Sequence, residues 1–115
     1  MLVSNLKTPY FAVIFSTITT KNLEGYEETS IKMENLAKQQ KGYLGIETAR
    51  QKIGITVSYW KNEVDILEWK NNFEHILARE KGRTLWYQEY QIRICKVERA
   101  YEFSNLTNTI SIKKN

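Results

Sequence analysis

Residues Tyr10 to Ile18 read YFAVIFSTI, and this stretch decides how the rest of the chain is organised. It is rich in β-branched and aromatic residues and has no helical periodicity, so it predicts a first β-strand. Alternate positions place Phe11, Val13 and Phe15 on one face of this strand and Tyr10, Ala12, Ile14 and Ile18 on the other. Because both faces are apolar, we expect both to be covered.

The sequence that follows predicts one helix and then a pair of strands. Between Leu23 and Gln40, apolar residues recur at helical spacing, acidic residues occupy the first turn, and Gly42 follows the end. Residues 43–50 and 53–60 have the composition of strands, and only two residues connect them. Because so short a connection cannot hold a helical crossover, we expect these two strands to be antiparallel neighbours.

A second helix is predicted after Asn62, a residue type that suits a helix N-cap. Its expected buried positions are Val64, Leu67, Ile76 and Leu77. The polar run at residues 70–72 has low helix preference, so we expect a break there and a second helical piece over residues 73–81.

The last strand is predicted over residues 89–101, where apolar residues alternate again. Ile92 and Ile94 share one face, whereas Cys95 and Val97 share the other. This change of phase indicates a β-bulge.

The order of these elements predicts an α+β, ferredoxin-like βαββαβ domain, with a four-stranded antiparallel sheet and both helices on one face. The other face, apolar in the first and last strands, would be exposed to water, and such a patch usually marks an association surface. We therefore expect a homodimer in which two sheets pack face to face. Residues 1–9 are expected to form a loose leader and residues 10–101 the domain. Residues 102–115 would form a tail that is either disordered or an arm reaching the partner.

Composition limits the classes of partner. The chain has 115 residues, which suits one domain, and its net charge of +4 comes from 17 basic and 13 acidic residues that are scattered along the sequence. Without a cluster of cations, we expect no nucleic-acid partner. No apolar stretch is long enough for a membrane span. The single cysteine, Cys95, and the absence of a recognisable signal peptide favour the reducing cytoplasm.

The segment from Trp60 to Tyr87 is rich in side chains that can transfer protons, bind anions or line an aromatic pocket. These are Trp60, Trp69, His75, Arg83 and Tyr87. Histidine transfers protons near neutral pH and arginine holds anions, so these residues predict an aromatic-lined pocket beside the second helix. The two tryptophans also fit a role as core anchors, and the lone histidine also fits a surface or structural role.

Other chemistries lack their residue patterns. The acidic residues near the histidine do not make a metal-ligand set. No Gly-x-Ser-x-Gly motif and no phosphate loop occur, because the five glycines are scattered singly.

Several short runs make the chain resemble the antibiotic biosynthesis monooxygenase (ABM) family of the dimeric α+β barrel superfamily. They are Ser58-Tyr59-Trp60-Lys61-Asn62-Glu63, Trp69-Lys70, Glu74-His75, Gly82-Arg83, Trp86-Tyr87 and Val97-Glu98-Arg99-Ala100-Tyr101. The resemblance covers about residues 10–101. It implies a homodimer and an oxygenase that acts on a small aromatic or phenolic compound with O₂, without a metal or flavin cofactor. In this interpretation His75 accepts a proton, Arg83 anchors an anion, and Trp60, Trp69 and Tyr87 form the walls.

The haem-degrading branch of that family gives the sharpest comparison. Its pattern has two tryptophans nine residues apart, which Trp60 and Trp69 reproduce, then a histidine on the same helix and an asparagine in the first strand. Here Arg79 stands near the place expected for the histidine, His75 comes earlier, and the first strand contains no asparagine. The alternatives are a non-catalytic protein that binds haem or another small molecule in the same pocket, and a haem-degrading enzyme with a non-standard site. A third alternative is an interaction module whose apolar surface serves another protein.

Overall fold

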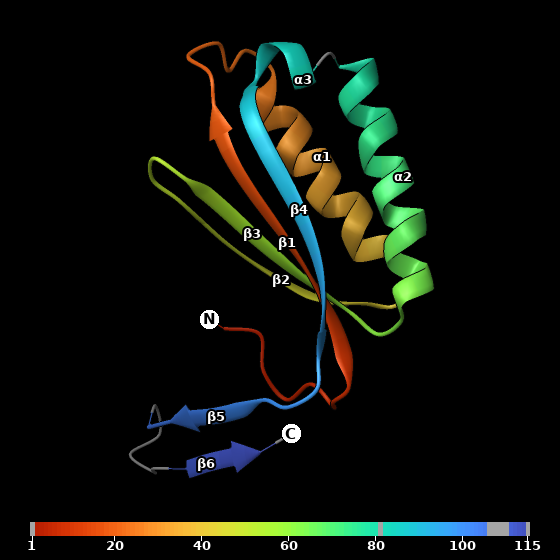
Figure 1. The fold of residues 1–115 in the computed structure, drawn as a ribbon, viewed down its shortest axis with the longest axis vertical. Helices are drawn as coiled ribbons and strands as arrows, with labels where there is room; N and C mark the ends of the chain where they lie inside the picture. Colours follow the sequence, from red (N-terminus) through yellow and green to blue (C-terminus); the bar gives the residue numbers. More distant parts are fainter. Residues whose placement is uncertain (1, 81, 106–110, 115) are drawn as a thin grey trace.

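The computed structural model describes residues 2–80, 82–105 and 111–114. Figure 1 shows a four-stranded sheet with two long helices on one face and a small hairpin beyond one end. The strand order is β2-β3-β1-β4, and neighbouring strands are antiparallel. The elements are β1 (Tyr10–Thr19), α1 (Tyr26–Gln39), β2 (Tyr43–Arg50), β3 (Gly54–Trp60), α2 (Glu63–Arg79), α3 (Gly82–Leu85), β4 (Tyr87–Val97), β5 (Tyr101–Ser104) and β6 (Ser111–Lys114). The predicted α+β, ferredoxin-like fold with helices on one face of the sheet is confirmed.

Strand β1 lies inside the sheet, paired with β3 on one side and β4 on the other. Residues that are directly opposite on neighbouring strands point to the same face. Phe11, Val13 and Phe15 pack in the core beneath the helices, and we call this the helix-bearing face. Tyr10 and Ala12 point to the other, open face, yet they too are buried. Both faces of β1 are therefore apolar, as the sequence predicts.

The centre of the core is a pair of stacked tryptophans. The ring centroids of Trp60 at the end of β3 and Trp69 on α2 are 6.3 Å apart, with 24° between the ring planes. Trp60 has no exposed surface, and its indole N–H donates a hydrogen bond of 2.8 Å to the Ser58 hydroxyl. Ile66 and Leu77 are buried as completely on the same side of α2. This packing fixes α2 against the sheet.

Helix α2 runs without interruption from Glu63 to Arg79, so the predicted break at residues 70–72 is wrong. Ile66, Trp69, Phe73 and Ile76 recur every three or four residues and all pack in the core. An apolar face that continues through the polar run holds the helix together, because tertiary packing outweighs weak local helix preference.

The predicted rotation of the first half of α2 is also wrong. Val64 and Leu67 are 69% and 53% exposed, whereas Asp65 and Ile66 are buried. Once Trp69 docks inward, the helical period turns the residue three positions earlier inward and the residue two positions earlier outward. In the second half of α2, Ile76 and Leu77 are buried as predicted.

The register of β4 against β1 is unbroken from Glu89 to Val97, so the bulge predicted within this stretch is wrong. The irregularity lies at the start of β4, where Ile18 pairs with Glu89 and Thr19 pairs with Tyr87. The apolar residues change face along a regular strand, and no extra residue causes the change.

The open face is apolar mainly on β1 and β3. Ile14 of β1 is half-buried there, and Ile55 of β3 is 45% exposed. On β4 the same face carries Glu89, Gln91 and Arg93. The prediction of an apolar open face on the last strand therefore holds only at the end of β4, beyond these polar residues.

The first residues of the chain lie against one end of the open face. The backbone N–H of Val3 donates to one carboxylate oxygen of Glu47 at 2.8 Å, and the Tyr59 hydroxyl donates to the other at 2.6 Å. A Cβ at Gly45 would lie 2.8 Å from a Val3 methyl carbon, so the chain passes very close to β2. The segment expected as a loose leader is tied to the sheet at this point.

Strands β5 and β6 form the hairpin seen below the sheet in Figure 1. The backbone N–H of Asn5 donates to the Glu102 carboxylate at 2.9 Å, which connects the hairpin to the leader. Tyr101 and Phe103 are 62% and 59% exposed. The described part of the expected tail is thus strand structure, while residues 106–110 and 115 lie outside the described residues.

We expect Leu77→Ala to lower the free energy of unfolding by about 2 to 5 kcal/mol, because truncation of a completely buried leucine leaves a cavity. Leu67→Ala on the same helix should cost no more than about 0.5 kcal/mol, because that side chain is largely in water. Urea denaturation of both variants measures the difference. Equal costs would contradict the rotation of α2 described above.

Candidate functional site

A pocket of about 140 Å³ lies between the helix-bearing face of the sheet and the two long helices. All four strands of the sheet and both helices contribute to its lining. Its aromatic wall residues are Phe15, Tyr26, Trp69, Phe73, Trp86 and Tyr87, and Met33 adds a flexible apolar side chain. A mostly apolar cavity with a few polar groups is the usual form of a small-molecule site.

Edge-to-face aromatic contacts hold these walls in place. The ring centroid of Phe15 is 5.0 Å from that of Phe73 and 5.8 Å from that of Tyr87, with interplanar angles of 81° and 82°. On the sheet side, the small residues Thr56 and Ser58 leave the space that larger side chains would fill. The pocket is therefore a consequence of large residues at the walls and small residues on the floor.

Few polar groups reach this pocket. Thr48 and Thr56 hydrogen-bond each other through their hydroxyls at 2.9 Å. Glu34 on α1 and Lys70 on α2 supply the two charged side chains of the lining. Glu34 forms an ion pair with Lys38 at 3.4 Å, and both of these side chains are about half exposed.

The structure brings two of the five predicted site residues into the pocket. Trp69 and Tyr87 line it, and both are buried. Trp60 lies behind Trp69 in the core and does not line the pocket. His75 and Arg83 are exposed, and neither is part of the lining.

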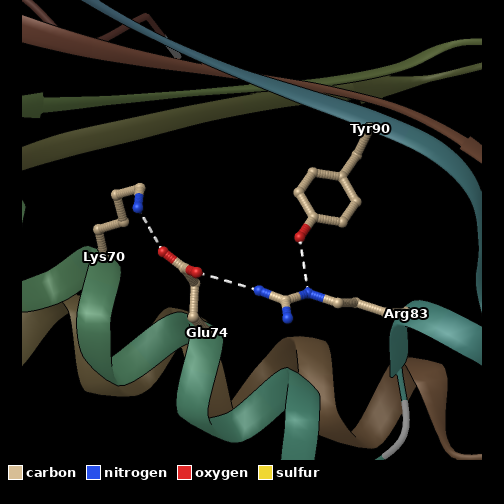
Figure 2. A network of polar contacts seen from close by, with 4 residues as sticks. All are labelled: Lys70, Glu74, Arg83 and Tyr90. Carbon is tan, nitrogen blue, oxygen red and sulfur yellow. Dashed lines mark hydrogen bonds and ion pairs between the residues drawn. The ribbon is translucent and has the colours of Figure 1, made fainter.

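Arg83 belongs to a polar network that connects α2, α3 and β4, shown in Figure 2. Its guanidinium donates to the Tyr90 hydroxyl at 2.9 Å and to one carboxylate oxygen of Glu74 at 3.0 Å. Lys70 donates to the other oxygen of Glu74. Hydrogen bonding to Lys70 is the main reason why the pKa of Glu74 is lowered. The arginine predicted to anchor an anion therefore already holds a carboxylate of its own chain.

Tyr87 is the most perturbed titratable group in the lining. Burial raises the pKa of its phenol far above the usual value, and the neighbouring Tyr26 raises it further. The phenol therefore stays protonated at physiological pH, and its side chain is hydrogen-bonded to Tyr26.

Sequence reasoning missed several wall residues that lie outside the segment rich in tryptophan. The sequence predicts Phe15 on an apolar face of the first strand, and Met33 lies within the helix predicted between Leu23 and Gln40. Only the spatial arrangement of the elements shows that these two faces enclose a cavity. The position of Phe73 was not predicted, because the helix break expected at residues 70–72 separates Phe73 from the part of the helix that contains Trp69.

The described residues contain neither a metal-binding cluster nor a helix that could cross a membrane. No group of three or more histidine, cysteine or acidic side chains in residues 2–80, 82–105 and 111–114 is placed to hold a metal ion. No helix in this part of the chain has the length and apolar character that crossing a membrane requires.

Comparison with known proteins adds a family and supports the fold. No family model matches the chain. It is 46% identical over 102 residues to the uncharacterized protein YqjZ of Bacillus subtilis, and the match covers 87% of this chain and 90% of that protein. The chain belongs to the YqjZ family. A relative of this length and identity carries the same fold, but its name gives no activity.

Solved structures share the fold at low sequence identity. SnoaB from Streptomyces nogalater, a cofactor-independent oxygenase, superposes with a TM-score of 0.64 at 7% identity and covers 79% of this chain and 95% of SnoaB. A candidate antibiotic biosynthesis monooxygenase from Nitrosomonas europaea gives a TM-score of 0.61 at 10% identity, over 82% of this chain and 94% of that one. These similarities support the ABM-type fold that the sequence motifs indicate, and at such identities they establish the fold alone.

We expect Glu74→Gln to destabilise the protein by less than about 1 kcal/mol at pH 7, because its side chain is one-third exposed and solvent screens the pairs. The pKa of Glu74 is lowered on folding, so its stabilising effect is present above the pKa of about 4.3 in the unfolded chain and is lost as pH falls through the folded value. Urea unfolding of wild type and variant from pH 7 to pH 2 should show the difference shrinking towards zero.

The matched control is Glu68→Gln on the same helix. Among the described residues, Glu68 takes part in no ion pair, so its substitution should leave stability nearly unchanged at every pH. A difference that grows in acid would contradict the role of the network.

Proposed function

We propose that this chain is a cofactor-independent, monooxygenase-like protein that binds a small aromatic or phenolic compound in the pocket between sheet and helices. The observation that carries this proposal is the aromatic pocket itself, in a fold shared with SnoaB and other ABM-type proteins. Trp69 and Tyr87 form walls of the site, and Trp60 supports Trp69 from behind.

The volume of the pocket limits the size of the ligand. A buried apolar cavity of about 150 Å³ in another protein holds one benzene molecule. The pocket of about 140 Å³ therefore suits a compound with one aromatic ring, whose substituents can extend towards the opening. A ring of this size would contact the apolar walls on both sides.

The proposed reaction converts a phenol and O₂ into a para-quinone and water. The O–H bond and the para C–H bond of the phenol break, and a C=O bond forms at the para carbon. One oxygen atom of O₂ enters the quinone and the other leaves as water, so the ring gives up four electrons and O₂ accepts them. Removal of the phenol proton starts the reaction, because the phenolate is the form that gives an electron to O₂.

The site contains one carboxylate that is placed to accept this proton. A base must lie within hydrogen-bonding reach of the substrate, and Glu34 lines the pocket whereas His75 does not. We therefore assign proton acceptance to Glu34 and keep His75 as the competing assignment. Arg83 is bound to Glu74 and serves the network that joins α2 to β4.

A second candidate function is ligand binding without turnover. The position of His75 favours this function. The only histidine of the chain is exposed and lies outside the pocket, so it does not line the site as a proton acceptor would. Haem is a weaker candidate, as ligand or as substrate, because a pocket that fits one aromatic ring would have to open widely to admit a porphyrin.

We also propose that the protein is a homodimer that pairs through the open faces of two sheets. Ile55 is 45% exposed on this face, and Ile14, Ile18 and Val57 lie beside it. Burial of such a patch stabilises an interface by roughly 25 cal/mol per Å² of apolar surface removed from water. The free thiol of Cys95 is exposed, which suits the reducing cytoplasm that we propose as the location.

The pocket assignment predicts that Thr56→Phe abolishes activity. Thr56 lines the pocket floor, so a phenylalanine there fills the space of the ligand ring. With 2-methoxyphenol, an electron-rich phenol with a free para position, wild type should consume O₂ and form the quinone in equal amounts. An oxygen electrode and the visible absorbance of the quinone measure both quantities.

Two further variants test the acceptor in the same assay. Glu34→Gln should slow O₂ uptake by at least about a hundredfold, within the range typical of general bases, while His75→Ala should leave it unchanged. The reverse result would assign the proton to His75. If all variants bind the phenol but none turns it over, and wild type does not either, the protein is a binding protein.

For the dimer, we expect Ile55→Lys to convert the protein to a monomer, because the interface would have to bury an unpaired charge. Val64→Lys is the control, since Val64 is 69% exposed on α2, away from the sheet. Light scattering after size exclusion reports the mass of each. A wild type that is monomeric at micromolar concentration would overturn the pairing.

A further inference from the structure

Arg50 at the end of β2 is placed unlike any other arginine of the described chain. Its guanidinium lies over Gly54 of β3 and donates a hydrogen bond to the hydroxyl of Thr17 on β1. A Cβ at position 54 would lie 2.0 Å from Nη2 and 2.7 Å from Nη1 of Arg50. The guanidinium therefore occupies the space that the missing side chain of Gly54 leaves free.

The guanidinium of Arg50 lies on the helix-bearing face of the sheet, next to the pocket. Arg50 pairs with Gly54, and Gly54 pairs with Thr17, so the three residues form a row across β2, β3 and β1. The next row on the same face contains Thr48 and Thr56, which line the pocket. Successive rows on one face are two residues apart along a strand, or roughly 7 Å. Arg50 is exposed and is not itself part of the lining, so its guanidinium lies one row outside the residues that enclose the cavity.

The charge of Arg50 also reaches the pocket wall. Tyr87 lines the cavity, and the positive charge of Arg50 acts on its phenol. In contrast to Arg83, which holds Glu74, Arg50 forms no ion pair with a carboxylate among the residues that the structure describes. A hydroxyl is the only partner shown for its forked set of donors.

We propose that Arg50 forms an anion subsite at the border of the pocket and that the ligand is a single-ring aromatic carboxylate. The ring lies between Phe15 and Trp69, and the carboxylate faces the guanidinium, which binds planar oxyanions through two parallel hydrogen bonds. This subsite rests on the proposed function, because it uses the same pocket.

The protonation of Tyr87 supports this arrangement. Burial raises the pKa of its phenol, so at neutral pH the group is uncharged and does not repel an anion. The site therefore offers the positive charge of an arginine beside an uncharged wall to a negatively charged ligand.

The test compares 3-hydroxybenzoate with 3-hydroxybenzamide, which have nearly the same shape, differ in charge and leave the carbon para to the hydroxyl free, as the proposed reaction requires. Titration calorimetry at low ionic strength measures both dissociation constants. Wild type should bind the carboxylate at least about tenfold more tightly than the amide, the scale of a hydrogen bond to a charged group. Arg50→Gln should remove this preference and leave the affinity for the amide within about twofold.

Two further variants test whether the preference for the carboxylate depends on where the guanidinium of Arg50 lies, and not only on the presence of a positive charge. Gly54→Ala keeps Arg50 but places a methyl group where the guanidinium lies, so it should reduce the preference for the carboxylate as Arg50→Gln does. Arg93→Gln removes an exposed arginine on the open face of the sheet and should change neither constant.

Each outcome decides a different question. Equal binding of carboxylate and amide by wild type overturns the subsite and leaves the aromatic pocket standing. Loss of the preference in Arg83→Gln instead of Arg50→Gln also overturns it. If wild type binds neither compound, the subsite and the proposed function fall together.

Discussion

The stacking of Trp69 on Trp60 is the interaction on which the rest of the structure depends. Trp60 ends β3, at a point where the sheet passes into the loop before α2, and Trp69 lies at the end of the second turn of that helix. Large aromatic pairs contribute both buried area and a preferred geometry. This contact therefore sets the rotation of α2 about its own axis, and the rotation determines which residues of the helix face the sheet.

The pocket follows from that rotation. With Trp69 inward, Phe73 also points to the sheet and meets Phe15 of β1 edge to face. These rings keep the helix at a distance from a floor made of small residues such as Thr56 and Ser58. Close packing normally excludes voids, so this cavity persists only because rigid aromatic walls prevent α2 from settling onto the sheet.

How much of this could be predicted from the sequence depends on the range of the interactions. The order of elements, the two apolar faces of β1 and the hairpin of β2 and β3 came from local patterns, because alternation and turn length act over a few residues. The continuity of α2 could not be predicted in that way, since the polar residues at 70–72 are weak helix formers and only core packing overrides them. The exposure of Val64 and Leu67 was missed for the same reason.

The candidate site was harder to predict than the fold. Trp69 and Tyr87 were predicted because they belong to the segment rich in aromatic residues beside the second helix. His75 and Arg83 were chosen for the chemistry of their side chains, but chemistry does not show which way a side chain points or what it binds. Arg83 and Arg50 have the same side chain, and only the distances in the folded protein show that the first holds Glu74 while the second does not.

The apolar surface of the open face is covered by the chain itself over one part and is exposed over another. Near the start of β1, the chain covers this face itself, because Val3 is bound to Glu47 and packs over Gly45. Farther along β1, Ile14 and Ile18 stand next to β3 without such a cover, and Ile55 remains 45% exposed. In the dimer that we propose, the partner sheet would cover only that second part. Because β4 adds charged residues of both signs, Glu89 and Arg93, at its margin, two copies related by a two-fold axis can bring unlike charges together around an apolar centre.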